Sequence, residues 1–135
     1  MGNLAALTSL DLGSNTLSGM IPTEFAKLTK LEVLSFDLNR LSGSLPSEIG
    51  AMAALSRLDL SYNRMVGRLP SEIGELSNLR TLLIGANFFT GAVPIELCSL
   101  WDMELNIFLG DYCESDNING GGLTCSAAPS CCRGC

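Results

Sequence analysis

The sequence predicts a β-rich, right-handed solenoid, in which short coils stack to form a parallel β-sheet on the concave face of the molecule. The first observation behind this prediction is a period of 24 residues that runs without insertion through four copies. The period is carried by asparagine (Asn15, Asn39, Asn63, Asn87), glycine (Gly19, Gly43, Gly67, Gly91) and proline (Pro22, Pro46, Pro70, Pro94). The second observation is that apolar residues hold the same phase. Self-similarity with a fixed period of this length is the sequence signature of solenoids.

The first part of each repeat predicts a short strand with one buried face. In the first repeat, Leu7, Leu10 and Leu12 are followed by apolar residues at the equivalent positions of the next three repeats. The alternation from Leu10 to Leu12 has the period of a half-buried strand. Successive strands would then lie about 4.8 Å apart in a parallel sheet. Since no repeat can bury its leucines alone, neighbouring repeats must complete the core.

The asparagine after each strand predicts a polar corner inside the solenoid. The chain turns inward there, and its amides and carbonyls would be unpaired without a side chain that both donates and accepts. We therefore expect Asn15, Asn39, Asn63 and Asn87 to stack as a structural ladder. The glycine allows close approach or unusual dihedral angles, and the proline ends the short extended segment that precedes it.

These motifs resemble the plant-specific class of leucine-rich repeats, whose pattern reads LxxLxLxxNxLSGxIP. The resemblance rests on Asn15 to Pro22 (NTLSGMIP) and Asn39 to Pro46 (NRLSGSLP), and it extends over residues 2–97. The third and fourth repeats depart from the pattern but keep its buried positions apolar. The resemblance implies short second strands formed by the Gly-x-Ile-Pro segment, with 3-10 or coil segments outside. It also implies a receptor-like ectodomain or a secreted recognition protein that binds a ligand or another protein.

The period divides the chain into two regions. Residues 1–97 would hold four repeats (1–25, 26–49, 50–73 and 74–97), and residues 98–135 a cysteine-rich C-terminal cap. The chain starts in the middle of the repeat pattern, which leaves two alternatives open: earlier repeats are missing, or a partner or second copy covers the N-terminal edge. The register after Leu97 is also open. Either Leu100 keeps the phase, or Leu105 and Phe108 restart the pattern two residues out of register.

All six cysteines lie in the C-terminal region: Cys98, Cys113, Cys125, Cys131, Cys132 and Cys135. An even number of cysteines in a small segment predicts disulfide bonds, whose pairing stays open, and an oxidising compartment, either secreted or lumenal. A zinc site formed by the last four cysteines is the less favoured alternative, because their spacing does not match common zinc motifs. The tail resembles the cysteine-rich tails of secreted leucine-rich-repeat proteins of photosynthetic protists.

Composition excludes several function classes. The chain of 135 residues has a formal net charge of −6 and no basic run, so nucleic acid is not an expected partner. No apolar stretch approaches the roughly 20 residues of a membrane span. Histidine is absent, which removes most nucleophilic triads and proton shuttles. We therefore predict neither an enzyme nor a cofactor nor a metal site.

The concave face offers the candidate binding residues, because every second strand residue and the residues just after the strand point to solvent. The candidates are Val33, Asp37, Leu38, Arg57, Asp59, Tyr62 and Leu83. Leu38, Tyr62 and Ala86 share one column, and exposed apolar side chains near an arginine are typical of partner-binding surfaces. The alternative is that scattered exposed apolar residues have no function.

Charged residues on the solenoid surface are interpreted as solvated. We expect Asp11, Asp37 and Asp59 to lie in different columns and therefore not to form a calcium site. The glutamates of the outer edge recur once per repeat by repeat identity. An ice-binding face is not expected, because no flat column of threonine appears. The leading functional hypothesis is a protein-recognition module, and the alternative is a structural subunit docked through its uncapped N-terminal edge.

Overall fold

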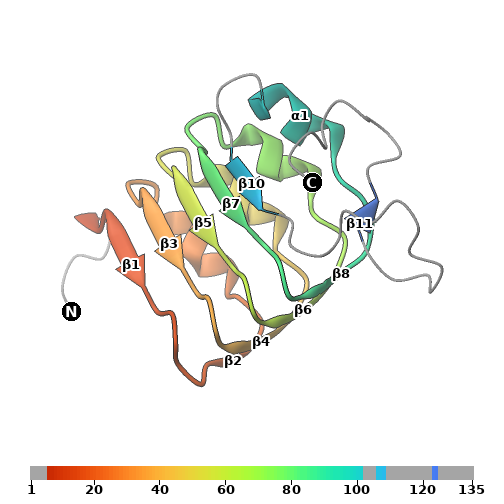
Figure 1. Cartoon of the computed structure of the whole chain (residues 1–135). Coiled ribbons are helices and arrows are strands. Elements are labelled where there is room, and N and C mark those ends of the chain that lie inside the picture. The colour runs from red at the N-terminus through yellow and green to blue at the C-terminus, as the bar shows by residue number, and fades with distance from the viewer. Residues whose placement is uncertain (1–5, 102–105, 109–122, 125–135) are drawn as a thin grey trace.

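The computed structural model describes residues 6–101, 106–108 and 123–124, and these residues form the expected solenoid of stacked coils (Figure 1). The concave sheet has five parallel strands in the order β1-β3-β5-β7-β10. They are β1 (Ser9–Asp11), β3 (Val33–Ser35), β5 (Arg57–Asp59), β7 (Thr81–Leu83) and β10 (Asn106–Phe108). From β1 to β7 the central leucines pair directly with one another, so the 24-residue period is also the register of the sheet.

The fifth strand departs from both registers that the sequence left open. Ile107 of β10 pairs with Leu82 of β7, which is a shift of one residue from the 24-residue period and not zero or two. The preceding element explains the extra residue, because the fourth coil contains the α-helix α1 (Ile95–Trp101) where the earlier coils contain 3-10 helices of five residues.

A second sheet lies along another side of the solenoid, in the order β2-β4-β6-β8 (Figure 1). Its strands are β2 (Ser18–Gly19), β4 (Arg40–Gly43), β6 (Arg64–Gly67) and β8 (Phe88–Phe89). A separate pair joins β9 (Gly91–Ala92) to β11 (Leu123–Thr124). The second sheet is present as the resemblance implied, but its strands come before and up to the glycine, whereas the Gly-x-Ile-Pro segment was expected to form them. The glycines have φ between +76° and +89°, so β2, β4 and β6 end where the backbone turns left-handed, whereas β8 ends two residues before Gly91.

The third side of the solenoid is a row of helices: η2 (Thr23–Lys27), η3 (Ser47–Ala51), η4 (Ser71–Glu75) and α1. Proline precedes each 3-10 helix in an extended conformation, with φ of −64°, −69° and −70° at Pro22, Pro46 and Pro70. Neighbouring helices approach closely. A Cβ atom on Gly74 would lie 2.3 Å from Cβ of Glu96 and 2.9 Å from its carbonyl carbon. Glycine at this position therefore sets the spacing between the last two coils.

The core fills the space between the two sheets and the helices. From the second coil on, the repeat leucines and their apolar replacements are buried, and Leu58, Met65, Ile73 and Phe89 have no exposed surface. In the first coil, Leu7, Leu10 and Leu12 are only partly buried against the core. In the described part of the chain, no helix is long and apolar enough to cross a membrane.

Candidate binding surface

The asparagine corner fixes the backbone at the edge of the concave sheet. In the third coil, Nδ2 of Asn63 donates to the carbonyl oxygen of Leu60 in its own coil (3.1 Å) and to that of Phe36 in the preceding coil (2.9 Å). Its Oδ1 accepts from the amide of Leu41 at 2.9 Å. Asn39 and Asn87 repeat this pattern, and both are buried. Asn15 is exposed and bonds only to Leu12 and Gly13 of its own coil.

The residue before each asparagine adopts a left-handed conformation. The φ angles are 55° at Ser14, 52° at Leu38, 54° at Tyr62 and 53° at Ala86. For residues other than glycine, this conformation costs roughly 1–2 kcal/mol. The hydrogen bonds of the neighbouring asparagine hold it in place. As a consequence, the side chains at this position turn outward, and Leu38 and Tyr62 are 52% and 61% exposed.

The strand residues form columns that differ from one sequence expectation. Asp11 pairs with Ser35, and Ser35 pairs with Asp59, so two of the three aspartates share a column. The expectation that all three occupy different columns was wrong, because Asp11 and Asp59 are two full periods apart. Asp37 lies outside this column. No group of three or more metal-binding side chains exists among the described residues.

Asp59 was expected to be exposed, and this was wrong: the residue is buried. Its carboxylate accepts from Nη2 of Arg57 at 3.0 Å and from Oγ of Ser61 at 2.7 Å. These bonds explain its burial, because a carboxylate loses water without a large penalty when nearby protein donors replace it. Asp59 therefore positions Arg57, whose side chain remains 45% exposed. Asp37 is held in a similar way, by Oγ of Ser35 at 2.7 Å.

The remaining candidates, Val33 and Leu83, lie on strands next to Arg57 and Asp59. Val33 and Leu83 are half-buried on β3 and β7, the strands on either side of β5. Val33 pairs with Arg57, and Leu83 pairs with Asp59. The structure thus brings Val33, Arg57, Leu38 and Tyr62 onto one side of neighbouring coils, with Leu83 one strand further along. Asp59 is buried on the same strand as Arg57.

Sequence reasoning missed the exposed residues of the second sheet. Arg40 and Arg64 are exposed, as are Val66 (45%) and Phe88 (62%). The available signal was their alternation with the buried residues Leu41, Met65 and Phe89, which is the pattern of a strand with one solvent face.

The disulfide prediction falls outside the described residues. Cys98 lies in α1, and Cys113, Cys125, Cys131, Cys132 and Cys135 are not among the residues that the structure describes.

The family model described as Leucine Rich Repeat matches residues 6–28, 30–52 and 54–76, which together make up just over half of the chain. The chain therefore belongs to the leucine-rich-repeat family. No curated protein sequence matches it closely enough to count as a relative.

Solved structures with the same fold include plant receptor ectodomains. The ectodomain of the receptor kinase GASSHO1/SCHENGEN3 from Arabidopsis thaliana, in complex with CASPARIAN STRIP INTEGRITY FACTOR 2, is 44% identical with a TM-score of 0.71; the match covers 73% of this chain and 12% of that one. The BIR2 ectodomain from the same plant is 28% identical, with a TM-score of 0.71 and coverages of 90% and 60%. A plant ice-binding protein is 31% identical, with a TM-score of 0.66 and coverages of 69% and 30%. This chain thus spans less than two thirds of each of these structures.

Proposed function

We propose that this chain is an extracellular recognition module that binds a peptide or protein on its concave face, around Leu38 and Tyr62. The observation that carries the proposal is the outward display of two large apolar side chains from left-handed positions. The left-handed backbone recurs in all four coils, so the strain itself is structural, and it is the large exposed side chains of Leu38 and Tyr62 at this position that point to a partner. A fixed backbone also lowers the entropy that a binding surface loses when it meets its partner.

The neighbouring residues fit the same role. Arg57 is held by Asp59 and still exposes nearly half of its side chain, which makes it a preorganised donor for a carboxylate or carbonyl oxygen of the partner. Tyrosine and arginine are the residue types that most often dominate binding energy at interfaces. The strands from β1 to β7 span only about 20 Å at 4.8 Å per coil, which suits a peptide or a small patch. The similar structure of the Arabidopsis receptor kinase HAESA in complex with the peptide hormone IDA supports this choice of ligand class.

Site-specific photo-crosslinking tests the proposal directly. A benzophenone amino acid replaces Tyr62 in one variant and Ser47, an exposed residue of η3, in the control variant. Each variant is incubated with extracellular fluid and irradiated. We expect a protein or peptide adduct from position 62 and not from position 47, and loss of this adduct when Leu38→Asp is added. Identical adducts from both positions, or none from position 62, would contradict the proposal.

Docking through the N-terminal edge is a second candidate function. It is favoured by the partial exposure of Leu7, Leu10 and Leu12 and by the 39% exposure of Leu17. Capture of a partner through this edge would be blocked by Leu17→Glu and left intact by Tyr62→Asp, whereas concave binding predicts the opposite.

Ice binding, the function of the plant ice-binding protein with a similar structure, is not favoured here. The exposed columns of the concave sheet mix Ser9, Val33, Arg57 and Thr81, so they present no repeated spacing of hydroxyl or methyl groups.

A further inference from the structure

The solvent face of the second sheet differs in character from the rest of the surface. In β4, β6 and β8 the buried residues Leu41, Met65 and Phe89 alternate with exposed ones. The exposed side chains comprise two arginines, a valine and a phenylalanine: Arg40, Arg64, Val66 and Phe88. We call these four residues the second-sheet patch.

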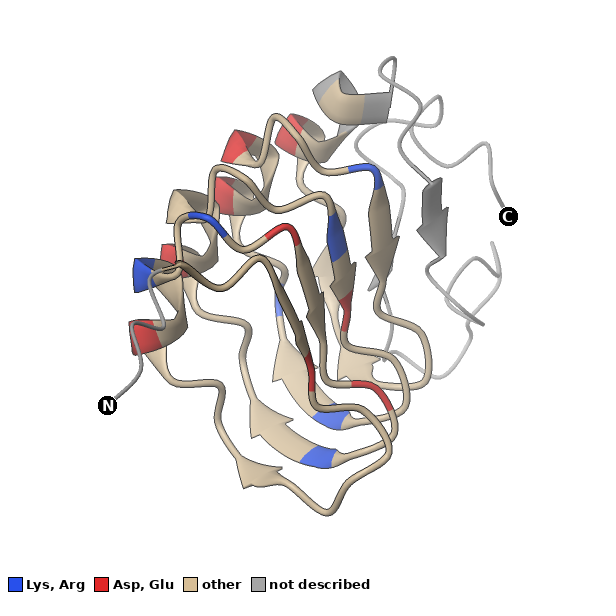
Figure 2. Ribbon diagram, turned by 90° about the vertical axis from the view of Figure 1, so that its left-hand side faces the viewer, with Lys and Arg blue, Asp and Glu red and all other residues tan. Residues whose placement is uncertain are grey.

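Charge is separated between the sides of the solenoid (Figure 2). The four segments that build the second sheet, residues 15–22, 39–46, 63–70 and 87–94, contain Arg40, Arg64 and Arg68 and no acidic residue. The chain as a whole carries a net charge of −6. Its described acidic residues lie on the helices, such as Glu48 and Glu72, and on or next to the concave strands. The second sheet is thus a cationic face on an acidic protein.

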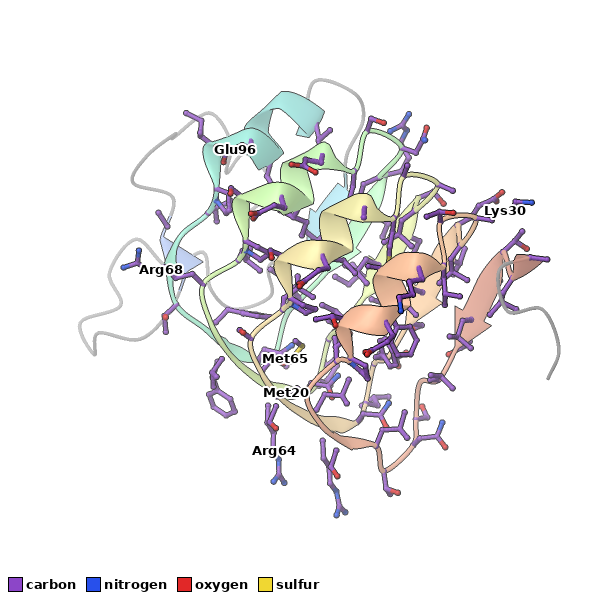
Figure 3. The ribbon with its side chains drawn as sticks, turned by 180° about the vertical axis from the view of Figure 1, so that it is seen from behind. Met20, Lys30, Arg64, Met65, Arg68 and Glu96 are labelled. Carbon is purple, nitrogen blue, oxygen red and sulfur yellow. The ribbon has the colours of Figure 1, made fainter. Side chains whose placement is uncertain are left out.

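The two arginines of the patch occupy equivalent positions of neighbouring coils. Figure 2 shows basic segments on neighbouring strands of the second sheet, and the pairing of Arg64 with Ser42 places Arg64 two residues out of direct register with Arg40. Among the described residues, no acidic side chain forms an ion pair with Arg40 or Arg64. Arg64 points away from the ribbon (Figure 3). Two like charges in adjacent coils repel each other, and nothing within the described fold offsets that repulsion.

The apolar members of the patch are placed beside the charges. Val66 and Phe88 pair across β6 and β8, and Arg64 pairs with Ser42 of β4. The next row of side chains is packed against the left-handed glycines. Met20 covers Gly43, and Arg68 covers Gly91, each close to where a Cβ atom would stand. Side chains are therefore packed against the backbone beside the patch.

We propose that the second-sheet patch is a further docking surface, for an acidic segment of a partner protein. The segment would place carboxylates against Arg40 and Arg64 and an apolar side chain against Val66 and Phe88. Charge complementarity favours an acidic partner, and arginine pairs with carboxylates in a bidentate geometry. The exposed Phe88 and Val66 favour a protein over a purely anionic polymer, because aromatic residues and arginine together are typical of interface centres. This surface is separate from the concave face, so both can be occupied at once.

Titration with synthetic peptides tests this proposal. The probe is a short peptide in which glutamates flank leucines, and its counterparts are the glutamine version and poly-glutamate of the same length. Binding is followed on the isotope-labelled protein by NMR and by fluorescence anisotropy. We expect amide shifts in β4, β6 and β8. We also expect Arg40→Gln/Arg64→Gln to weaken binding by about five- to twentyfold, as two exposed charge pairs would. Phe88→Ser should also weaken it, and the glutamine peptide should not bind.

The control variant Lys27→Gln/Lys30→Gln removes the same charge from exposed positions outside the second sheet. We expect it to bind the peptide as the original protein does. Equal losses in the two double variants would overturn the proposal in favour of net charge alone. If poly-glutamate bound as tightly as the glutamate–leucine peptide and Phe88→Ser had no effect, the patch would be a generic polyanion site and the proposal would be wrong. The proposal would also be overturned if no amide shifts occurred in these strands. The same holds if sedimentation velocity showed a dimer of this chain that the peptide dissociates, because a second copy would then be the occupant of the patch. Tyr62→Asp should leave peptide binding unchanged, which separates this surface from the concave one.

Discussion

Replacing Asn63 by alanine tests whether the asparagine ladder holds the coils together. Asn63 connects two coils through four backbone groups, and three of the bonds reach Phe36, Leu41 and Leu60. The fourth goes to the carbonyl oxygen of Ser61 at 3.3 Å. We expect Asn63→Ala to destabilise the protein strongly and Asn15→Ala, the matched control, to do so weakly.

The magnitude follows from which groups lose their only partner. The carbonyl oxygen of Phe36 also accepts from Asn39 at 3.0 Å, and that of Leu60 accepts from Asn87 at 2.8 Å, so both keep one bond. The amide of Leu41 keeps none, and it is buried. A buried unpaired amide costs about 1–3 kcal/mol, and each bond lost from a carbonyl that keeps another adds roughly 0.5–1.5 kcal/mol. For one amide and two carbonyl bonds the sum is about 2–6 kcal/mol, against a typical total stability of 5–15 kcal/mol.

Equilibrium unfolding in urea, followed by far-ultraviolet circular dichroism, measures this difference. With a slope of roughly 1–3 kcal/mol per molar urea, the midpoint of Asn63→Ala should fall by about 1 M or more with an unchanged slope. Asn15→Ala should lose at most about 1 kcal/mol, because Asn15 is exposed and bonds only within its own coil. Equal losses at positions 15 and 63 would refute the ladder as the source of stability.

Three further predictions concern the same backbone features. Asn63→Asp places a carboxylate against the carbonyl oxygens of Phe36 and Leu60, which raises the pKa of the new group in the folded state above its unfolded value of about 3.9. Relative to the original protein, the variant should therefore keep its stability below that pH and lose it as the pH rises. Urea unfolding at acid and at neutral pH measures this difference. Gly74→Ala brings Cβ into the backbone of Glu96 and should lower the free energy of unfolding by about 2 kcal/mol or more. Gly67→Ala meets only Cβ of Ser44 at 3.5 Å and should lower it by about 1–2 kcal/mol, because of its φ of +84°. Thermal unfolding compares the two variants, and a larger loss for Gly67→Ala would contradict the close-approach argument. Tyr62→Asn should raise the free energy of unfolding in urea by about 0.5–1 kcal/mol, because asparagine tolerates the left-handed conformation better than tyrosine does. The same variant should lose binding to the partner that crosslinking identifies. A loss of stability would show that Tyr62 supports the fold.

The fold could be predicted because its determinants are local and repeated. The pairing of Leu10, Leu34, Leu58 and Leu82 follows directly from the period, since a parallel sheet whose strands repeat at a constant interval keeps a constant register. The register of β10 could not be predicted. It depends on whether the fourth coil forms a 3-10 or an α-helix, and Ile95–Trp101 carries no residue that decides between them.

The candidate surface was predicted less well, for a different reason. Whether a strand residue that faces solvent is exposed depends on the side chains two residues away. Asp59 is buried because Arg57 and Ser61 both turn onto it, whereas Asp11 in the same column stays exposed. The sequence contains these neighbours but not their rotamers, so the burial of Asp59 could not be predicted from it.

The repeat itself separates structural from functional positions. A residue that recurs in every coil is explained by the coil: the asparagines by their backbone bonds and the left-handed glycines by their φ angles. The position before asparagine is different, because its backbone is strained in all four coils and yet its side chain is free to vary. The small residues Ser14 and Ala86 satisfy that backbone as well as any residue except glycine or asparagine, so the coil does not require Leu38 or Tyr62 there. Leu38 and Tyr62 expose more than half of their surface, and the fold does not explain large apolar side chains at this position. A partner that covers them would explain these side chains, and the crosslinking experiment searches for that partner.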